Sequence, residues 1–147
     1  RAYLERGELD RAMQHGLEVV KIEPTAPDGY FNLGVLLEKM GRADEAIAAY
    51  RDAIRVAPQQ ASAHLNLGIV LARQGRLEEA EQELREAVRG QPSSVAARNN
   101  LGSVLAMRGA TDEAVAQFEE AVRLDPHNEN SRGNLERARA LRGVARP

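Results

Sequence analysis

Residues 61–92 read ASAHLNLGIVLARQGRLEEAEQELREAVRGQP, and the sequence on both sides repeats this pattern. A shift of 34 residues in either direction moves Asn66-Leu67-Gly68 onto Asn32-Leu33-Gly34 or Asn100-Leu101-Gly102. Four glycines, four alanines and four prolines keep the same spacing: Gly7, Gly41, Gly75, Gly109, Ala12, Ala46, Ala80, Ala114, Pro24, Pro58, Pro92 and Pro126. A period of this length is typical of stacked repeat proteins.

Each unit is predicted to contain two amphipathic helices. Apolar residues recur at three- and four-residue steps in both halves of the unit: Ala63, Leu67, Val70 and Leu71, then Leu77, Ala80, Leu84, Ala87 and Val88. Gly75 is expected to end the first helix, because glycine adopts the left-handed conformation without a Cβ clash. Pro92 ends the second, since proline lacks an amide hydrogen. The unit is therefore a helix, a tight turn and a second helix.

Small residues are expected where the two helices cross. Gly68 lies inside the first helix, where glycine costs about 0.8–1 kcal/mol relative to alanine. A glycine recurs there in every complete unit, which indicates a packing reason. We expect Ala80 of the second helix to face Gly68, so that the two backbones approach closely.

The complete pattern resembles the tetratricopeptide repeat. In three copies the same residue types occur at fixed offsets: Asn-Leu-Gly, a leucine, glycine, alanine, a large residue, alanine and proline. The leucine is Leu37, Leu71 or Leu105, and the large residue is Tyr50, Leu84 or Phe118. The RNA-reading pentatricopeptide family has a 35-residue period and other signature residues. The resemblance implies an all-α fold, a right-handed superhelical solenoid of antiparallel helix pairs with a C-terminal capping helix.

The organisation predicted is a single array of repeats. Residues 1–24 form a partial repeat, residues 27–58, 61–92 and 95–126 form complete repeats, and residues 129–142 form the capping helix. In that helix Glu136 replaces the glycine and Arg139 replaces the large apolar residue, as expected where charge faces water.

The N-terminal unit departs from the others. Residues 1–6 are interpreted as the end of a first helix, and residues 9–22 as its partner. Gly16 stands where the other units have a large residue. We expect Tyr3, Leu4 and the Gly16 site to leave an apolar patch that supports weak self-association. Because the chain starts at Arg1, we interpret it as a fragment from which a signal or anchor could have been removed.

Composition excludes several function classes. The net charge is −2, from 20 basic and 22 acidic residues, without a basic run, so no nucleic-acid partner is expected. Cysteine is absent, and no apolar run approaches the ~20 residues that a membrane span needs, so direct membrane insertion is not expected. His15, His64 and His127 do not pair at a repeated spacing, so we expect no metal, no cofactor and no catalysis. The richness in alanine, arginine and glutamate suggests a soluble bacterial protein of the cytoplasm or periplasm.

The resemblance implies that the first helices line a concave groove. Asn32, Asn66, Asn100 and Asn134 precede the packed leucines, about 100° round the helix from the core stripe. An amide carries a donor and an acceptor, so this ladder suits a peptide backbone. It is similar to the asparagine ladder in the repeat region of O-linked N-acetylglucosamine transferase. The alternative is that asparagine is simply common at this position. The neighbouring groove positions are Phe31, Val35, Leu65, Ile69, Asn99, Ser103, Lys39 and Arg73.

Three functions remain after these arguments. The first is a non-enzymatic scaffold that binds an extended or helical peptide segment of a partner protein. The second is the substrate-recruiting region of a larger enzyme such as a glycosyltransferase, and the third is a self-associating array. A clamp for a C-terminal carboxylate is disfavoured, because only Lys39 and Arg73 are cationic among the groove positions.

Overall fold

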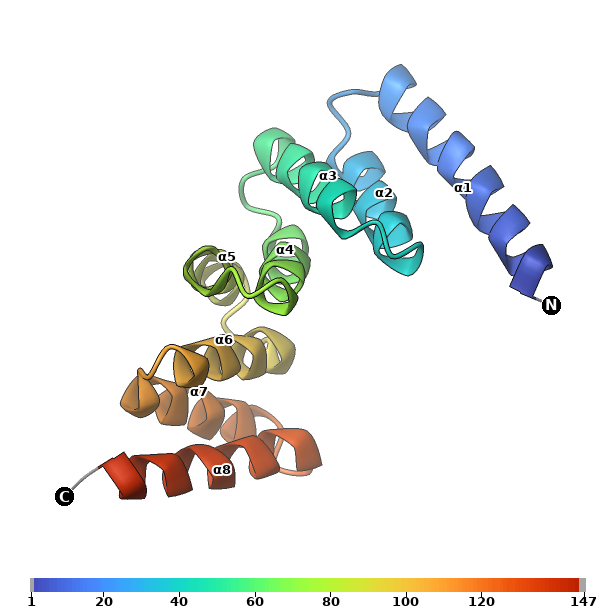
Figure 1. Cartoon of the computed structure of the whole chain (residues 1–147). Coiled ribbons are helices and arrows are strands. Elements are labelled where there is room, and N and C mark those ends of the chain that lie inside the picture. The colour runs from blue at the N-terminus through green and yellow to red at the C-terminus, as the bar shows by residue number, and fades with distance from the viewer. Residues whose placement is uncertain (1, 146–147) are drawn as a thin grey trace.

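The computed structural model describes residues 2–145 of the 147-residue chain, and the side chains of residues 5–144. Within this range the chain forms helices and no strand: α1 (Ala2–Ile22), α2 (Pro27–Lys39), α3 (Ala43–Val56), α4 (Ala61–Arg73), α5 (Leu77–Gly90), α6 (Val95–Met107), α7 (Thr111–Leu124) and α8 (Glu129–Ala145). Figure 1 shows them in sequence order along a curved path, with α4 inside the bend and α5 outside it. The predicted all-α fold of paired helices is confirmed.

A glycine ends the first helix of each complete unit. Gly41, Gly75 and Gly109 have φ of 73°, 76° and 83°, which lies in the left-handed region. The amide of the next residue bonds back to the helix, as Arg76 N–H does to the Leu71 carbonyl at 3.0 Å. This six-residue loop is the Schellman arrangement. The chain reverses direction directly after this turn, so the two helices of a unit pack against each other.

The glycine inside each first helix makes room for a large side chain of the second helix. A Cβ added to Gly34, Gly68 or Gly102 would lie 2.5–2.7 Å from the side chain of Tyr50, Leu84 or Phe118, respectively. The close approach is confirmed, but its main partner at Gly68 is Leu84, while the Ala80 carbonyl oxygen would lie at 3.3 Å. Ala80 is itself fully buried. The repeated glycine therefore receives a large residue rather than facing a small one.

The core runs along the array without interruption. Each first helix also packs on the second helix of the unit before it, so buried residues continue from Met13 in α1 to Ala138 in α8. Stacking of neighbours, rather than one central core, therefore holds the chain together. Each second helix of a complete unit ends two residues before a proline, at Val56, Gly90 and Leu124.

The prediction of a helix break near Gly7 is wrong. Helix α1 is continuous from Ala2 to Ile22, and Gly7 does not have a positive φ. Glycine permits a left-handed turn but does not impose one. Extending a helix adds one backbone hydrogen bond per residue, so the helix continues where a turn would gain no packing. The side chains of Tyr3 and Leu4 lie outside the described part of the chain.

The C-terminal helix α8 extends to Ala145, three residues beyond the predicted end. Leu135, Ala138 and Ser131 are buried against the preceding unit, and Arg139 forms an ion pair with Glu119 at 2.9 Å. Charged residues occupy its exposed side, as predicted for a cap. Across residues 2–145 we find no helix with the length and apolar character that crossing a membrane requires.

Candidate functional site

We call the face of α2, α4, α6 and α8, the first helices of their units, that is turned toward the inside of the bend in Figure 1 the inner face. Most of the predicted groove positions lie there. Phe31, Val35, Leu65 and Ile69 are half-buried, Ser103 is half-buried, and Lys39 and Arg73 are exposed. Partly exposed apolar side chains therefore follow one another on α2 and α4, and polar ones continue on α6.

The asparagine ladder is not uniform. Asn32 is exposed, and its amide has no hydrogen-bond partner among the residues that the structure describes. The Asn66 amide donates to the Tyr50 hydroxyl at 3.2 Å. The Asn100 amide donates to the Ala96 carbonyl at 2.8 Å, and the Asn134 oxygen accepts from Arg137 at 2.5 Å. Asn32 has its whole amide free, whereas Asn66 and Asn100 each use one N–H and Asn134 uses its oxygen, so part of each of these three amides stays free for a ligand.

Asn66 belongs to a hydrogen-bonded network that connects α2, α3 and α4. The Tyr50 hydroxyl donates to Glu38 at 2.5 Å, and Arg73 donates to the other oxygen of Glu38 at 3.2 Å. Burial raises the pKa of Tyr50 well above its usual value, and the Glu38 carboxylate raises it further. The phenol therefore stays protonated, and the network presents an amide and a guanidinium on the inner face.

Sequence reasoning missed Glu38 and Tyr50 as parts of this network. Tyr50 was assigned to the core, where it does lie fully buried, but its hydroxyl also bonds to Glu38 and Asn66. Its ring centroid is 5.8 Å from that of Phe31, with the planes tilted by 47°. The only signal in the sequence was the ionic pair Glu38 and Arg73, which lie 35 residues apart on successive first helices.

Asn99 does not line the inner face. It is only 7% exposed, and its amide donates to the buried Ser131 hydroxyl of α8 at 2.7 Å. The Ser103 hydroxyl donates to the Asn99 backbone carbonyl at 2.9 Å. Asn99 occupies the position of Phe31 and Leu65, but the capping helix covers it. We therefore remove Asn99 from the predicted ligand contacts.

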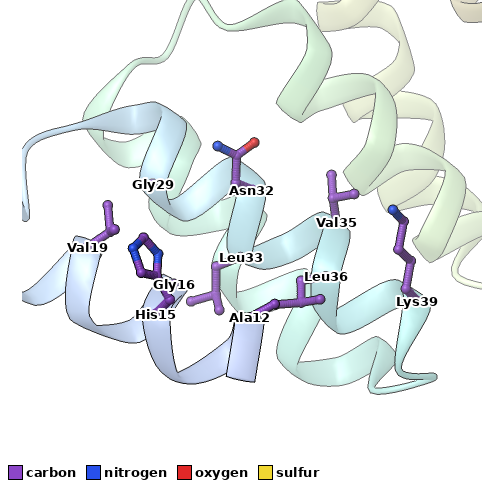
Figure 2. Close-up of a pocket in the computed structure, with 10 residues that line it drawn as sticks. All are labelled: Ala12, His15, Gly16, Val19, Gly29, Asn32, Leu33, Val35, Leu36 and Lys39. Atoms are coloured by element: carbon purple, nitrogen blue, oxygen red, sulfur yellow. The ribbon is translucent and has the colours of Figure 1, made fainter. Parts of the chain in front are cut away.

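A cavity of about 360 Å³ lies between α1 and α2. Figure 2 shows the residues that line it: Ala12, His15, Gly16 and Val19 from α1, and Gly29, Asn32, Leu33, Val35, Leu36 and Lys39 from α2 or its start. Three predicted ligand contacts, Asn32, Val35 and Lys39, thus border this N-terminal cavity. The sequence indicated it only through Gly16.

The described residues contain no cluster of three or more histidines, cysteines or carboxylates that could hold a metal ion. His64 is buried, with one ring nitrogen 2.6 Å from a Glu83 oxygen and the other 2.9 Å from the Pro58 carbonyl. The bond to Glu83 raises the pKa of His64 more than burial lowers it. His64 therefore joins α4 to α5, which is a structural role.

Family models match most of the chain. A tetratricopeptide repeat model matches residues 31–95 and 81–129, and a TPR repeat model matches residues 1–41. A search among curated proteins finds no match.

Solved structures of similar fold cover nearly the whole chain. A crystal structure of MamA has a TM-score of 0.87 at 21% identity, covering 95% of this chain and 82% of that one. YrrB, described as a TPR protein with an unusual peptide-binding site, has a TM-score of 0.83 at 24% identity, covering 97% and 73%. The first TPR of Spaghetti (RPAP3), bound to an HSP90 peptide, has a TM-score of 0.77 at 21% identity, covering 80% and 93%. At these identities the likeness is one of fold.

Proposed function

Because the chain belongs to the tetratricopeptide repeat family, we propose that it is a non-enzymatic module that binds a peptide segment of a partner protein on its inner face. Domains of this family mediate binding to proteins and peptides, and two proteins of similar fold are described as peptide-binding or peptide-bound. The proposal rests on one feature above all. Half-buried apolar side chains of α2 and α4 lie beside side-chain amides on the same face.

The amides alone supply too little free energy for a useful affinity. A neutral hydrogen bond contributes about 0.5–1.5 kcal/mol net. Asn66 already uses one N–H for the Tyr50 hydroxyl, which leaves its oxygen and its second N–H for a ligand. A micromolar complex requires about 8 kcal/mol. Most of the affinity must therefore come from ligand side chains that contact Phe31, Val35, Leu65 and Ile69.

The expected ligand is an extended or helical segment with a few apolar side chains. The amides of Asn32 and Asn66 would bind its backbone whatever its sequence, because an amide can both donate and accept. Leu65 and Ile69 would select its side chains. The similarity of the asparagine series to the repeat region of O-linked N-acetylglucosamine transferase supports the first part of this proposal.

A peptide array screened with the 147-residue protein tests the proposal. Hits are then measured by fluorescence anisotropy with Ile69→Arg and with Ala116→Arg, which introduces the same side chain at an exposed position of α7. We expect Ile69→Arg to weaken the hits at least about tenfold, since one apolar contact of about 1.5 kcal/mol is replaced by a charge. Equal loss with Ala116→Arg, or no loss with Ile69→Arg, would reject the inner face as the site.

A further inference from the structure

A second cavity, of about 380 Å³, lies where α1 and α3 adjoin, and we call it the outer groove. It is lined by Met13, Leu17 and Val20 from α1, by Tyr30, Leu33 and Leu37 from α2, and by Arg42, Glu45, Ala48, Ala49 and Asp52 from α3 or the residue before it. None of the predicted peptide contacts on the inner face is among these residues. The floor of the groove is apolar, because Met13, Leu33 and Leu37 are at most 8% exposed. Its volume lies within the range of about 300–1,000 Å³ that ligand pockets have.

In the complete repeats an arginine bridges successive second helices. Arg51 of α3 donates to Glu79 of α5 at 2.9 Å, and an equivalent pair joins α5 to α7 at 2.8 Å. A shift of 34 residues toward the N-terminus turns the first pair into Leu17 and Glu45. The outer groove therefore has the acceptor of this ion pair, but a leucine in place of its donor.

The Glu45 carboxylate has room for the missing guanidinium. Arg42 donates to its two oxygens at 2.7 and 2.6 Å, as Arg76 donates to both oxygens of Glu79 at 2.8 Å. One Glu79 oxygen also accepts a bond from Arg51. A carboxylate offers about four lone-pair sites, and the Glu45 side chain is 57% exposed. Glu45 can therefore accept a second guanidinium while it keeps its bonds to Arg42.

A second polar group of the groove lacks the partner that its equivalents have. Tyr30 corresponds to His64, whose ring lies 2.6 Å from a Glu83 oxygen, and the same two positions are bonded in the third complete repeat. The residue equivalent to Glu83 is Ala49, whose methyl side chain forms no hydrogen bond. No residue that the structure describes bonds to the Tyr30 hydroxyl. The groove thus offers a carboxylate, a hydroxyl and an apolar floor.

The outer groove is open because of its own side chains. Leu17 is 51% exposed. Its equivalents Arg51 and Arg85 belong to second helices with a first helix on either side, and their side chains are still 52% and 42% exposed. A first helix instead covers positions such as Tyr50, which lies against α2. The groove is therefore formed by residues of α1, α2 and α3, including Ala48 where α5 has a glutamine.

We propose that the outer groove binds a helical segment of a partner protein in which an arginine is flanked by large apolar side chains. The arginine donates to Glu45, as the bridging arginines of the complete repeats donate to its equivalents. Ala48 and Ala49 follow Glu45 by three and four residues on α3. Apolar side chains one turn from the arginine therefore lie over these small residues and beside Leu17. The Tyr30 hydroxyl bonds a polar group of the segment. This site is separate from the inner face and does not depend on peptide binding there.

The probe is a helix-stabilised 15-residue synthetic peptide with arginine at position i and leucine at i−4, i−3, i+3 and i+4, a pattern that suits either direction of the helix. Its binding to the 147-residue protein is followed by fluorescence anisotropy. Leu17→Arg supplies the guanidinium to Glu45 from α1 itself. We expect this variant to bind the probe at least about tenfold more weakly. Its melting temperature should not change, because Leu17 is exposed. Ala116→Arg, the same side chain at an exposed position of α7, should leave binding unchanged.

A citrulline in place of the probe's arginine tests the ion pair, because citrulline has nearly the same shape without the charge. With the wild type we expect this exchange to weaken binding about fivefold, whereas Glu45→Gln should bind both probes alike. Glu113→Gln removes the equivalent carboxylate of α7, which is already bonded to Arg85, and should keep the difference between the probes. Ile69→Arg should leave binding unchanged, which separates this site from the inner face.

Four results would overturn the proposal. They are failure of the arginine probe to bind the wild type, full binding to Leu17→Arg, a difference between the two probes that persists in Glu45→Gln, and an equal loss with Ala116→Arg or Ile69→Arg. The comparison of the two probes does not depend on the folding of Leu17→Arg. Sedimentation velocity adds a fifth test. Self-association of the protein that Leu17→Arg abolishes would identify a second copy of the chain as the occupant.

Discussion

Helices α1 and α3 occupy the same place in successive units, yet one borders a cavity and the other lies in the core. Tyr50 of α3 is fully buried beneath α2, whereas its counterpart in α1, Gly16, borders about 360 Å³ of open space. Among residues 2–145, the first helix α2 lies over α3, and no first helix lies over α1. The comparison shows that each second helix depends on its own first helix for burial, as expected for a solenoid whose units bury little alone.

The largest effect on stability is expected from truncating the large buried residue in the second helix of a complete repeat. Leu84→Ala should lower the free energy of unfolding by about 2–5 kcal/mol, because Leu84 is fully buried against Gly68. Leu17→Ala in α1, where the leucine is 51% exposed, should change it by no more than about 0.5 kcal/mol. Urea denaturation measures both, and similar losses would show that the two units do not differ as described.

Alanine should have opposite effects at Gly68, which lies against a large side chain, and at Gly16, which occupies the large-residue position of α1. In Gly68→Ala the new Cβ would lie 2.6 Å from Leu84 Cγ, so we expect a loss of about 1–3 kcal/mol from overpacking. Gly16→Ala meets only Leu33 at 3.5 Å and should gain about 0.5–1 kcal/mol from helix propensity. A destabilising Gly16→Ala in thermal or urea unfolding would mean that this position is more crowded than its geometry shows.

Alanine at Asn66 and at Asn32 should also change the free energy of unfolding by different amounts, although the difference is smaller. Asn66→Ala removes a hydrogen bond to Tyr50 and should cost about 0.5–1.5 kcal/mol. Asn32→Ala should cost nothing measurable, because no described residue bonds to the Asn32 amide. Equal stability of the two variants would indicate that the Asn66 bond to Tyr50 is not formed in solution.

The smallest expected effect is a pH dependence of stability, from His64 between α4 and α5. The pKa of His64 is raised in the folded state, so its contribution to stability is complete below the unfolded value of about 6.5 and is lost as the pH rises through the folded pKa. The melting temperature should therefore fall as the pH increases from about 6 to 8.5. Glu83→Gln should flatten this part of the profile. An unchanged profile in Glu83→Gln would assign the dependence to another group.

The fold could be predicted from the sequence because its determinants repeat. Gly41, Gly75 and Gly109 mark the turns through backbone conformation, and the spacing of apolar residues marks the faces. These are local properties, and three copies of each make them unambiguous. The continuity of α1 through Gly7 could not be predicted, because Gly7 keeps the spacing of the turn glycines while its conformation depends on what packs against it.

The candidate site could be predicted only in part. Phe31, Val35, Leu65 and Ile69 lie where the repeat register places them. Asn99 is instead buried under α8, through a bond to a serine 32 residues away. The bond from Asn66 to Tyr50 likewise depends on the reach of a core side chain, which periodicity does not encode.

We propose that α2, α4 and α6 present a peptide-binding inner face. The side-chain amide signals of Asn32, Asn66 and Asn100 report on it directly in a ¹H–¹⁵N NMR titration with the tightest peptide from the array. We predict that the signals of Asn32 and Asn66, together with the backbone signals of Leu65 and Ile69, shift most, while those of the exposed side of α5 and α7 stay in place. Shifts confined to α5 and α7, with the asparagine signals unmoved, would contradict peptide binding on the inner face.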